Sequence, residues 1–324
     1  MLRFIVRRML SCIALLIAIS ILTVLIFEVA PSSNPALRLA GRIATPAQIH
    51  AVEVTWGFNK PVYVQYVRTM EKVFDGTVIS YAQQLNVEHQ ILIDLPPTIS
   101  LAVGAGIIWF VFGVLFGVLA AARSGRLLDR ALTVLSLIGI STPVFFLGAI
   151  LSFYLGFKLG IFPNSDYANL STKSFGAFFS SVPEWLYHMI LPWMTLSAVF
   201  IGVYSRVLRS TILDMVNDDF VRTARAKGLS ERQVMIRHVL RNSLIPIISL
   251  WGLDFASVIG GGAILTESVF NLQGVGQYAA QSIQLQDVPA VLVIVMFGAF
   301  FVVLLGAIVD VVHAWLDPRV RLSA

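Results

Sequence analysis

The sequence predicts an all-α membrane protein with six transmembrane helices, and three observations carry this prediction. Hydrophobic residues make up 57% of the 324 residues and charged residues only 13%, which is too apolar for an ordinary soluble domain. Six apolar runs approach the roughly 20 residues that a helix needs to cross a bilayer. The basic residues lie beside the ends of these runs, as membrane anchors do, and not in one patch that would bind nucleic acid.

The apolar runs divide the chain into three parts. Residues 1–30 are expected to form the first transmembrane helix, since the apolar run after Arg8 is longer than the core of a cleaved signal peptide. Residues 31–96 are more polar and are expected to form an extracytoplasmic segment, with an amphipathic helix at 63–74. Residues 97–324 are expected to form the core transmembrane domain. Its five spans are predicted at residues 98–122, 132–157, 187–208, 247–270 and 288–314.

A proline is predicted to kink the third span. Pro143 follows Ser141 and Thr142, and a proline inside a membrane helix frees a carbonyl that hydroxyl groups and neighbouring helices can satisfy. The loops at 160–185 and 271–287 are expected on the outer side of the membrane.

The basic residues also orient the predicted spans. Of the 23 Lys and Arg residues, 16 fall in the N-terminal segment, the turn at 123–130, the stretch 206–241 and the C-terminal tail. Short loops dominate orientation, and the loop at 271–287 contains no Lys or Arg. Both termini of this multi-pass chain are therefore expected in the cytoplasm.

The polar stretch at residues 210–246 carries signals for a short helix. Asp218 or Asp219 is a suitable N-cap for a helix over 220–227, and Gly228 lies where a left-handed residue would end it. The stretch therefore begins with a helix of about two turns.

A second helix is expected to follow directly. Ser230 and Gln233 have the spacing of a capping box, and the helix is predicted to run until Pro246 interrupts its backbone hydrogen bonds. The two helices would meet at a glycine elbow.

The segment from Thr223 to Ser230, Thr-Ala-Arg-Ala-Lys-Gly-Leu-Ser, resembles the cytoplasmic coupling loop of ABC importer permeases, especially the peptide and nickel branch. The general motif of such permeases is Glu-Ala-Ala, three residues, Gly, nine residues, then Ile-x-Leu-Pro. This chain keeps Ala224 and Gly228 but has Arg222 and Thr223 at the first two positions. Its proline, Pro246, falls five residues late. A solvated basic loop is the alternative explanation for this stretch alone.

Other segments resemble the same family, so that the likeness covers nearly the whole chain. They are Arg3-Phe4-Ile5-Val6-Arg7-Arg8, Ile140-Ser141-Thr142-Pro143, Leu159-Gly160-Ile161-Phe162-Pro163, Thr266-Glu267-Ser268-Val269-Phe270, Gly274-Val275-Gly276 and Leu316-Asp317-Pro318-Arg319. The resemblance implies the six-helix fold of a type I ABC importer permease in a bacterial inner membrane. It also implies a subunit that forms half of a translocation pathway for di- or oligopeptides.

The resemblance further implies a set of partners. These are a second homologous permease, two ATPase subunits or domains, an extracytoplasmic substrate-binding protein and membrane lipids, with no nucleic acid. ATP and Mg²⁺ would bind to the ATPases, and their hydrolysis cycle would drive alternating access.

Seven residues of the coupling loop are candidates for contact with the ATPases: Phe220, Val221, Arg222, Ala224, Arg225, Lys227 and Gly228. The small side chains of Val221 and Ala224, together with Gly228, would let the helix lie deep in a cleft of the partner. The basic side chains would meet carboxylates around the rim.

The chain lacks the motifs of an enzyme. It has no Gly-x-x-x-x-Gly-Lys-Ser/Thr loop to hold nucleotide phosphates, so we expect a non-catalytic subunit with no cofactor of its own. The five histidines show no metal-binding spacing, and the single cysteine, Cys12, excludes an intrachain disulfide. Ser141 and Ser205 have no histidine at the spacing of a hydrolase. The remaining alternatives are a self-contained channel and a permease for nickel or a glutathione-like solute.

Asp254 is the one acidic residue well inside a predicted span. A charged group at this depth is costly unless it is protonated, paired or wetted. On a helical wheel Asp254 lies with Trp251, Val258 and Gly261, away from the small residues that suit close helix packing. These four residues are the candidate lining of the translocation pathway. The alternative is a structural hydrogen bond from Asp254 to a neighbouring helix or to the partner permease.

Overall fold

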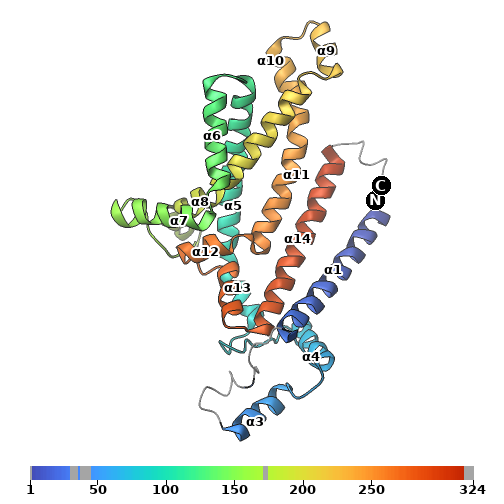
Figure 1. Cartoon of the computed structure of the whole chain (residues 1–324), viewed down its shortest axis with the longest axis vertical. Helices are drawn as coiled ribbons and strands as arrows, with labels where there is room; N and C mark the ends of the chain where they lie inside the picture. Colours follow the sequence, from blue (N-terminus) through green and yellow to red (C-terminus); the bar gives the residue numbers. More distant parts are fainter. Residues whose placement is uncertain (1, 30–35, 37–44, 171–173, 317–324) are drawn as a thin grey trace.

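The computed structural model describes residues 2–29, 36, 45–170 and 174–316, and within them the regular structure is helical, with a single isolated antiparallel bridge between Ile79 and Asn86. The helices are α1 (Leu2–Val29), α3 (Pro46–Trp56), α4 (Val62–Asp75), α5 (Val87–Ala122), α6 (Leu127–Ser141), α7 (Val144–Leu151), α8 (Phe175–Met215), α9 (Asp219–Ala226), α10 (Glu231–Gln233), α11 (Arg241–Ser257), α12 (Ile264–Phe270), α13 (Val275–Gln284) and α14 (Val288–Leu316). Three π-helical segments join them: η1 (Ser152–Lys158), η2 (Val234–Leu240) and η3 (Val258–Gly262). Figure 1 shows the long helices running between an end that carries α9 and an end that carries α13.

Four segments in the described part of the chain are long and apolar enough to cross a membrane: Val87–Ala122, Gly176–Met215, Glu231–Gly262 and Val288–Val309. The bent pair Leu127–Ser141 and Val144–Lys158 makes a fifth if it counts as one span, and α1 adds the shorter apolar helical stretch Ile13–Ile26. The chain is therefore a multi-pass helical membrane protein, as predicted. The number six remains a prediction.

The third predicted span is not one helix. α6 and the α7–η1 segment are bent by 101° relative to each other. Thr142 has an extended ψ of 122°, because a residue before proline avoids the helical conformation, and Pro143 itself has ψ 133°. The kink predicted at Pro143 is confirmed, whereas the continuous helix over 132–157 is wrong.

Prolines elsewhere leave the helices intact. α5 begins at Val87, with Asn86 capping it through a 2.7 Å bond to the His89 amide, and continues through Pro96 and Pro97. The predicted boundary at residue 97 therefore lies inside a helix. α8 likewise begins well before residue 187 and contains two prolines, so the outer loop expected at 160–185 is shorter. Membrane helices tolerate proline because neighbouring groups satisfy the freed carbonyls.

The fifth span also differs from its prediction at both ends. Pro246 lies within α11 and does not interrupt it, so the helical segment extends from Glu231 to Gly262. At its end Gly261 adopts φ 117°, a conformation that side chains disfavour, and the chain changes direction into α12. The expected continuation to Phe270 is therefore wrong.

The centre of the molecule is the contact between α5 and α8. Gly113 and Gly117 let α8 approach so closely that a Cβ on them would lie 2.6 Å from Tyr204 Cβ and 2.9 Å from Leu208 Cβ. Trp109, Tyr204 and Leu208 are fully buried there. Another face of α5 presents apolar residues four apart to the surroundings: Val103, Ile107, Val111, Leu115 and Leu119. Small residues inside and large apolar residues outside are the pattern of helices packed in lipid.

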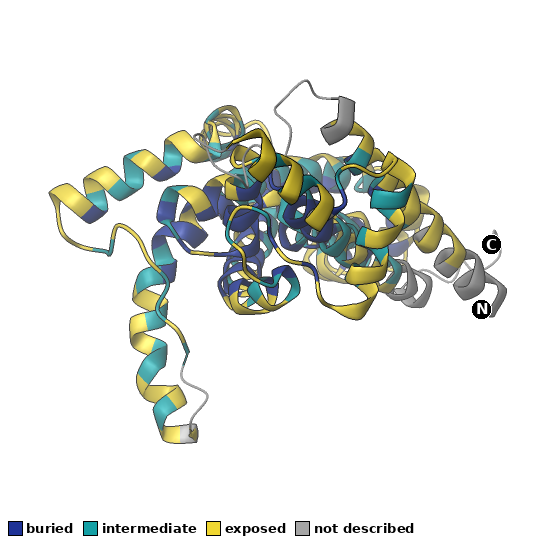
Figure 2. Ribbon diagram, turned by 90° about the horizontal axis from the view of Figure 1, so that it is seen from below, coloured by how far each residue is buried: buried dark blue, intermediate teal, exposed yellow. Residues whose placement is uncertain are grey.

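A second close contact joins η3 to α14. A Cβ on Gly260 would lie 3.0 Å from the carbonyl oxygen of Gly298, and a Cβ on Gly298 would overlap the Gly260 carbonyl. Gly252, two turns earlier, faces Val309 of α14 in the same way. Figure 2 shows the buried residues gathered in the centre of this bundle and mostly exposed residues on the helices that extend from it.

We predict that Gly298→Ala destabilises the protein, because the added methyl group must push the Gly260 backbone away. Overpacking of this kind costs roughly 1–3 kcal/mol. Gly176→Ala is the matched control, since a Cβ there meets nothing within 4 Å. Thermal unfolding in detergent should show a lower midpoint for Gly298→Ala alone. Equal midpoints for the two variants would contradict the close contact.

Candidate functional site

The polar elbow lies at one end of the molecule, beyond the ends of α8 and α11 (Figure 1). α9 covers Asp219–Ala226, one residue earlier at each end than predicted. Asp218 is its N-cap residue, although its side chain makes no capping hydrogen bond. Gly228 has φ 79°, and the predicted left-handed helix end is confirmed.

Local hydrogen bonds hold the elbow in shape. The Leu229 amide donates to the Ala224 carbonyl at 3.4 Å and the Gly228 amide to the Arg225 carbonyl at 2.9 Å, which is the Schellman pattern. The capping box of Ser230 and Gln233 is present as predicted. These contacts depend only on residues close in sequence, which is why the sequence predicts them well.

Two of the predicted contact residues turn inward. Val221 is fully buried and Ala224 is 5% exposed, and both belong to a cluster with Val234 and Val239 of η2. Their small size therefore lets α9 lie close to η2 of the same chain. Val221 and Ala224 were expected to let the helix lie deep in a cleft of the partner. In this structure both side chains pack inside the same chain instead.

Arg225 is also used within the elbow. Its Nε donates to Glu231 Oε1 at 2.8 Å and its Nη2 to Oε2 at 3.3 Å, across the glycine. A further guanidinium nitrogen lies 3.5 Å from the Val216 carbonyl. Arg225 thus links the end of α8, α9 and α10.

The remaining candidates, Phe220, Arg222, Lys227 and Gly228, are exposed, and so is Leu229 beside them. We call these five residues the elbow surface. Phe220 is 39% and Leu229 37% exposed, so both apolar side chains are partly open to solvent. Among the described residues, Arg222 pairs with Asp219 of its own helix alone, at 3.5 Å, and both side chains are largely exposed. Sequence reasoning missed Leu229, although an apolar residue just after the helix-ending glycine is a usual feature of this motif.

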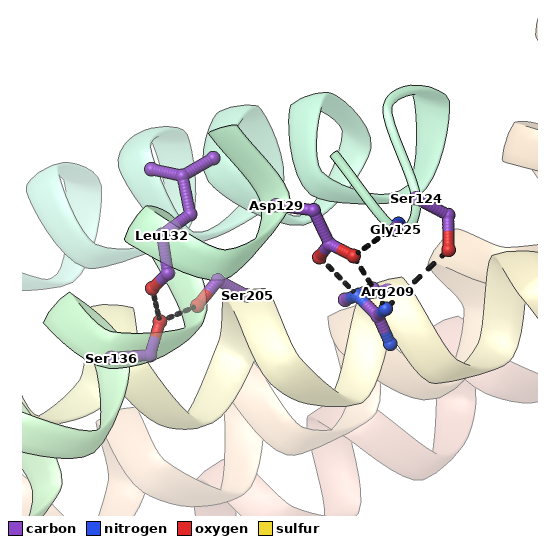
Figure 3. Close-up of polar contacts among 7 residues, drawn as sticks. All are labelled: Ser124, Gly125, Asp129, Leu132, Ser136, Ser205 and Arg209. Atoms are coloured by element: carbon purple, nitrogen blue, oxygen red, sulfur yellow. Dashed lines mark hydrogen bonds and ion pairs between the residues drawn. The ribbon is translucent and has the colours of Figure 1, made fainter. Parts of the chain in front are cut away.

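A second cluster fixes α8 just before the elbow (Figure 3). Arg209 of α8 binds Asp129 of α6 with two hydrogen bonds, 2.6 Å from Nε to Oδ1 and 2.8 Å from Nη2 to Oδ2. The Gly125 amide donates to the same carboxylate at 2.8 Å. One and two turns away, the hydroxyls of Ser136 and Ser205 bond at 2.8 Å. This α6–α8 clasp was not predicted, since Asp129 and Arg209 are 80 residues apart in sequence.

Asp254 bonds to a neighbouring helix. The Tyr204 hydroxyl of α8 donates to Asp254 Oδ2 at 2.7 Å. Asp254 points away from the small residues that pack on α14, as predicted, and its side chain is half-buried.

The other three residues of the predicted pathway lining do not form one surface with Asp254. Trp251 donates from Nε1 to the Gly106 carbonyl of α5 at 2.9 Å. Val258 is 2% exposed, and Gly261 lines a small apolar cavity between η3, α12, α13 and α14. Helical spacing placed these residues on one side of α11 but did not show which neighbouring helices cover that side.

The geometry defines a multi-pass helical membrane protein with a capped, exposed elbow at one end, and sequence comparison identifies its family. Residues 113–322 match the family described as "Binding-protein-dependent transport system inner membrane component", and residues 1–102 match its N-terminal counterpart. The chain belongs to this family of ABC transporter permeases.

Curated relatives match over almost their whole length. The chain is 35% identical to "Probable peptide ABC transporter permease protein y4tP" of Sinorhizobium fredii, covering 98% of this chain and 99% of that protein. It is 33% identical to the oligopeptide transport system permease protein AppB of Bacillus subtilis, covering 98% and 99%. It is also 33% identical to the glutathione transport system permease protein GsiC of Salmonella paratyphi A, covering 99% of both.

The fold is also found in a solved structure. An inward-facing structure of the MetNI methionine ABC transporter gives a TM-score of 0.53 at 15% identity, covering 70% of this chain and 96% of that chain. At this identity the likeness concerns the fold.

We predict that Arg209→Ala destabilises the protein by about 2 kcal/mol, because it leaves the Asp129 carboxylate, 5% exposed, without its main partner. Arg206→Ala is the matched control, since Arg206 is an exposed arginine on the same helix one turn earlier. Thermal unfolding of both variants in detergent tests this. An unchanged midpoint for Arg209→Ala would show that the clasp contributes nothing to stability.

Proposed function

We propose that this chain is a permease subunit of an ATP-driven peptide importer, and that its elbow passes motion from partner ATPases to the membrane helices. The observation that carries the proposal is the elbow itself: an internally braced helix pair that ends in an exposed surface of two apolar and two basic side chains. A surface of this kind suits docking into an acidic-rimmed cleft of another protein. The peptide cargo is supported by the names of relatives, which are peptide and oligopeptide permeases.

The elbow is connected to the spans in a way that suits transmission. α9 packs through Val221 and Ala224 on η2, which is continuous with α11, and follows α8 after a short turn. Arg225 braces that turn, and the α6–α8 clasp ties α8 to α6. A push on α9 would therefore move α8 and α11 together and be passed on to α6.

The proposed assembly contains a second homologous permease, two ATPase subunits or domains that bind ATP and Mg²⁺, and an extracytoplasmic substrate-binding protein. Within it this chain is non-catalytic. We place it in a bacterial inner membrane with six spans and both termini in the cytoplasm. The elbow, the basic turn between α5 and α6, the start of α1 and the end of α14 all lie toward the same end of the molecule, which supports that orientation (Figure 1).

Glutathione transport is a second candidate. It is supported by the 33% identity to the glutathione permease GsiC, which is as high as the identity to the oligopeptide permease AppB. Uptake assays with both classes of solute distinguish the two.

We expect Gly228→Val to weaken coupling, because valine at φ 79° costs roughly 1 kcal/mol or more and tilts the elbow surface. Gly76 offers a closely matched control: it also has a left-handed conformation, with φ 66° and open space around its Cβ position, but it ends α4, away from the elbow and the clasp. Co-purification with the ATPases and substrate-stimulated ATP hydrolysis should fall for Gly228→Val and persist for Gly76→Val. Equal behaviour of both variants would refute the special role of the elbow.

We also expect a defined pattern of labelling from outside the cell. In a Cys12→Ser background, Gln284→Cys at the α13 end should react with a membrane-impermeant maleimide, whereas Lys227→Cys on the elbow should react only after permeabilisation. Both positions are exposed in the structure. The reverse pattern would invert the proposed topology.

A further inference from the structure

Asp254 lies deep in a span and is only half covered by this chain. Eight residues separate it from Gly262, where the helical segment ends, which places it about 12 Å inside. Tyr204 occupies one carboxylate oxygen, Oδ2, and no other hydrogen bond or ion pair reaches Asp254 from the described residues. The second oxygen, Oδ1, is therefore available on the exposed side.

The exposed side of Asp254 cannot rest against lipid. An acidic side chain facing hydrocarbon near the centre of a bilayer is strongly disfavoured, and such residues face water-filled paths or other polar groups. In the assembled transporter, Oδ1 must therefore face the translocation pathway or a neighbouring subunit.

The carboxylate is held in place before any ligand arrives. Tyr204 is fully buried, lies beside Trp109 at 6.5 Å between ring centroids, and packs on Gly113 of α5. Its hydroxyl hydrogen is donated to Oδ2, so the carboxylate is oriented with its other oxygen outward. A group positioned in this way loses little freedom when it binds a ligand.

The aromatic residues next to Asp254 in sequence pack on α5 instead. Trp251 donates from Nε1 to the Gly106 carbonyl, and the Phe255 ring stacks on Trp251 at 5.1 Å between centroids. The free oxygen Oδ1 is thus the feature that would recognise a ligand, and a carboxylate oxygen suits an ammonium ion through a charge-assisted hydrogen bond.

We propose that Asp254 is a substrate-binding residue, which accepts the primary ammonium group of a peptide during translocation, and that Tyr204 is its positioning residue. The inference rests on the proposed transport function. Peptides and glutathione, the solutes in the names of the relatives, share a free ammonium group, so one carboxylate suits both.

The test uses the complete transporter in proteoliposomes with its binding protein. Two peptides of the same sequence are compared, one with a free α-amine and one N-acetylated, each at a concentration that saturates the binding protein equally. Uptake is measured for the wild type, Asp254→Asn, Asp254→Glu, Tyr204→Phe and Ser249→Ala. The last is the control, because the Ser249 hydroxyl bonds only to the Ile245 carbonyl of its own helix.

Asp254→Asn should lower uptake of the free-amine peptide about tenfold or more, the effect expected on losing a hydrogen bond between charged groups. Its uptake of the acetylated peptide should remain within about twofold of wild type, which removes the preference between the two peptides. Asp254→Glu should recover part of the preference and Tyr204→Phe should lose part of it, while Ser249→Ala matches the wild type.

Three results would overturn the proposal. An equal loss for both peptides would show a structural role, unchanged uptake of both would show no role, and loss of co-purification with the second permease would assign Oδ1 to a subunit contact. These results differ from a failure of the proposed function, in which the wild-type assembly itself would import neither peptide.

Discussion

Close approach between helix backbones is the constraint on which this structure depends. In lipid there is little hydrophobic force between helices, so contact must come from dense packing and hydrogen bonds. Gly113 and Gly117 bring α5 against α8, and Gly260 with Gly298 brings η3 against α14. These contacts fix the central bundle. The elbow follows α8, the α6–α8 clasp uses Arg209 of α8, and Asp254 bonds to Tyr204 of α8.

Buried carboxylates at two places in this bundle are paired with groups on other helices. Glu267 of α12 is fully buried and accepts hydrogen bonds from Thr98 at 2.8 Å and from the Gln277 amide at 2.9 Å, which ties α12 and the start of α13 to α5. At the opposite end, Asp129 and Arg209 neutralise each other. Asp254 differs from both, because its one hydrogen bond leaves an oxygen on the exposed side. Among these three carboxylates, Asp254 is therefore the one whose pairing is incomplete.

The candidate site was predicted to different degrees for different physical reasons. Caps, the left-handed Gly228 and the helix pair depend on neighbouring residues, and the prediction located them to within one residue. Val221 is buried against η2 of its own chain, a contact that the small size of its side chain did not reveal from the sequence. The Asp129–Arg209 clasp joins distant segments and had no local signal. The same division explains why the bond from Tyr204 to Asp254 was left open as one of two alternatives.

Composition and apolar run lengths determined, without any structure, that this is a helical membrane protein, because a bilayer admits only chains that satisfy their own backbone hydrogen bonds. The short motif around Gly228 determined the elbow and indicated the family. Tertiary structure decided how strongly each proline acts: the kink predicted at Pro143 is a bend of 101°, whereas Pro246, predicted to interrupt a helix, remains inside one. In either case proline removes one backbone hydrogen bond. Whether the helix then breaks depends on the conformation of the preceding residue and on the packing of neighbouring helices, and neither can be read from a linear sequence.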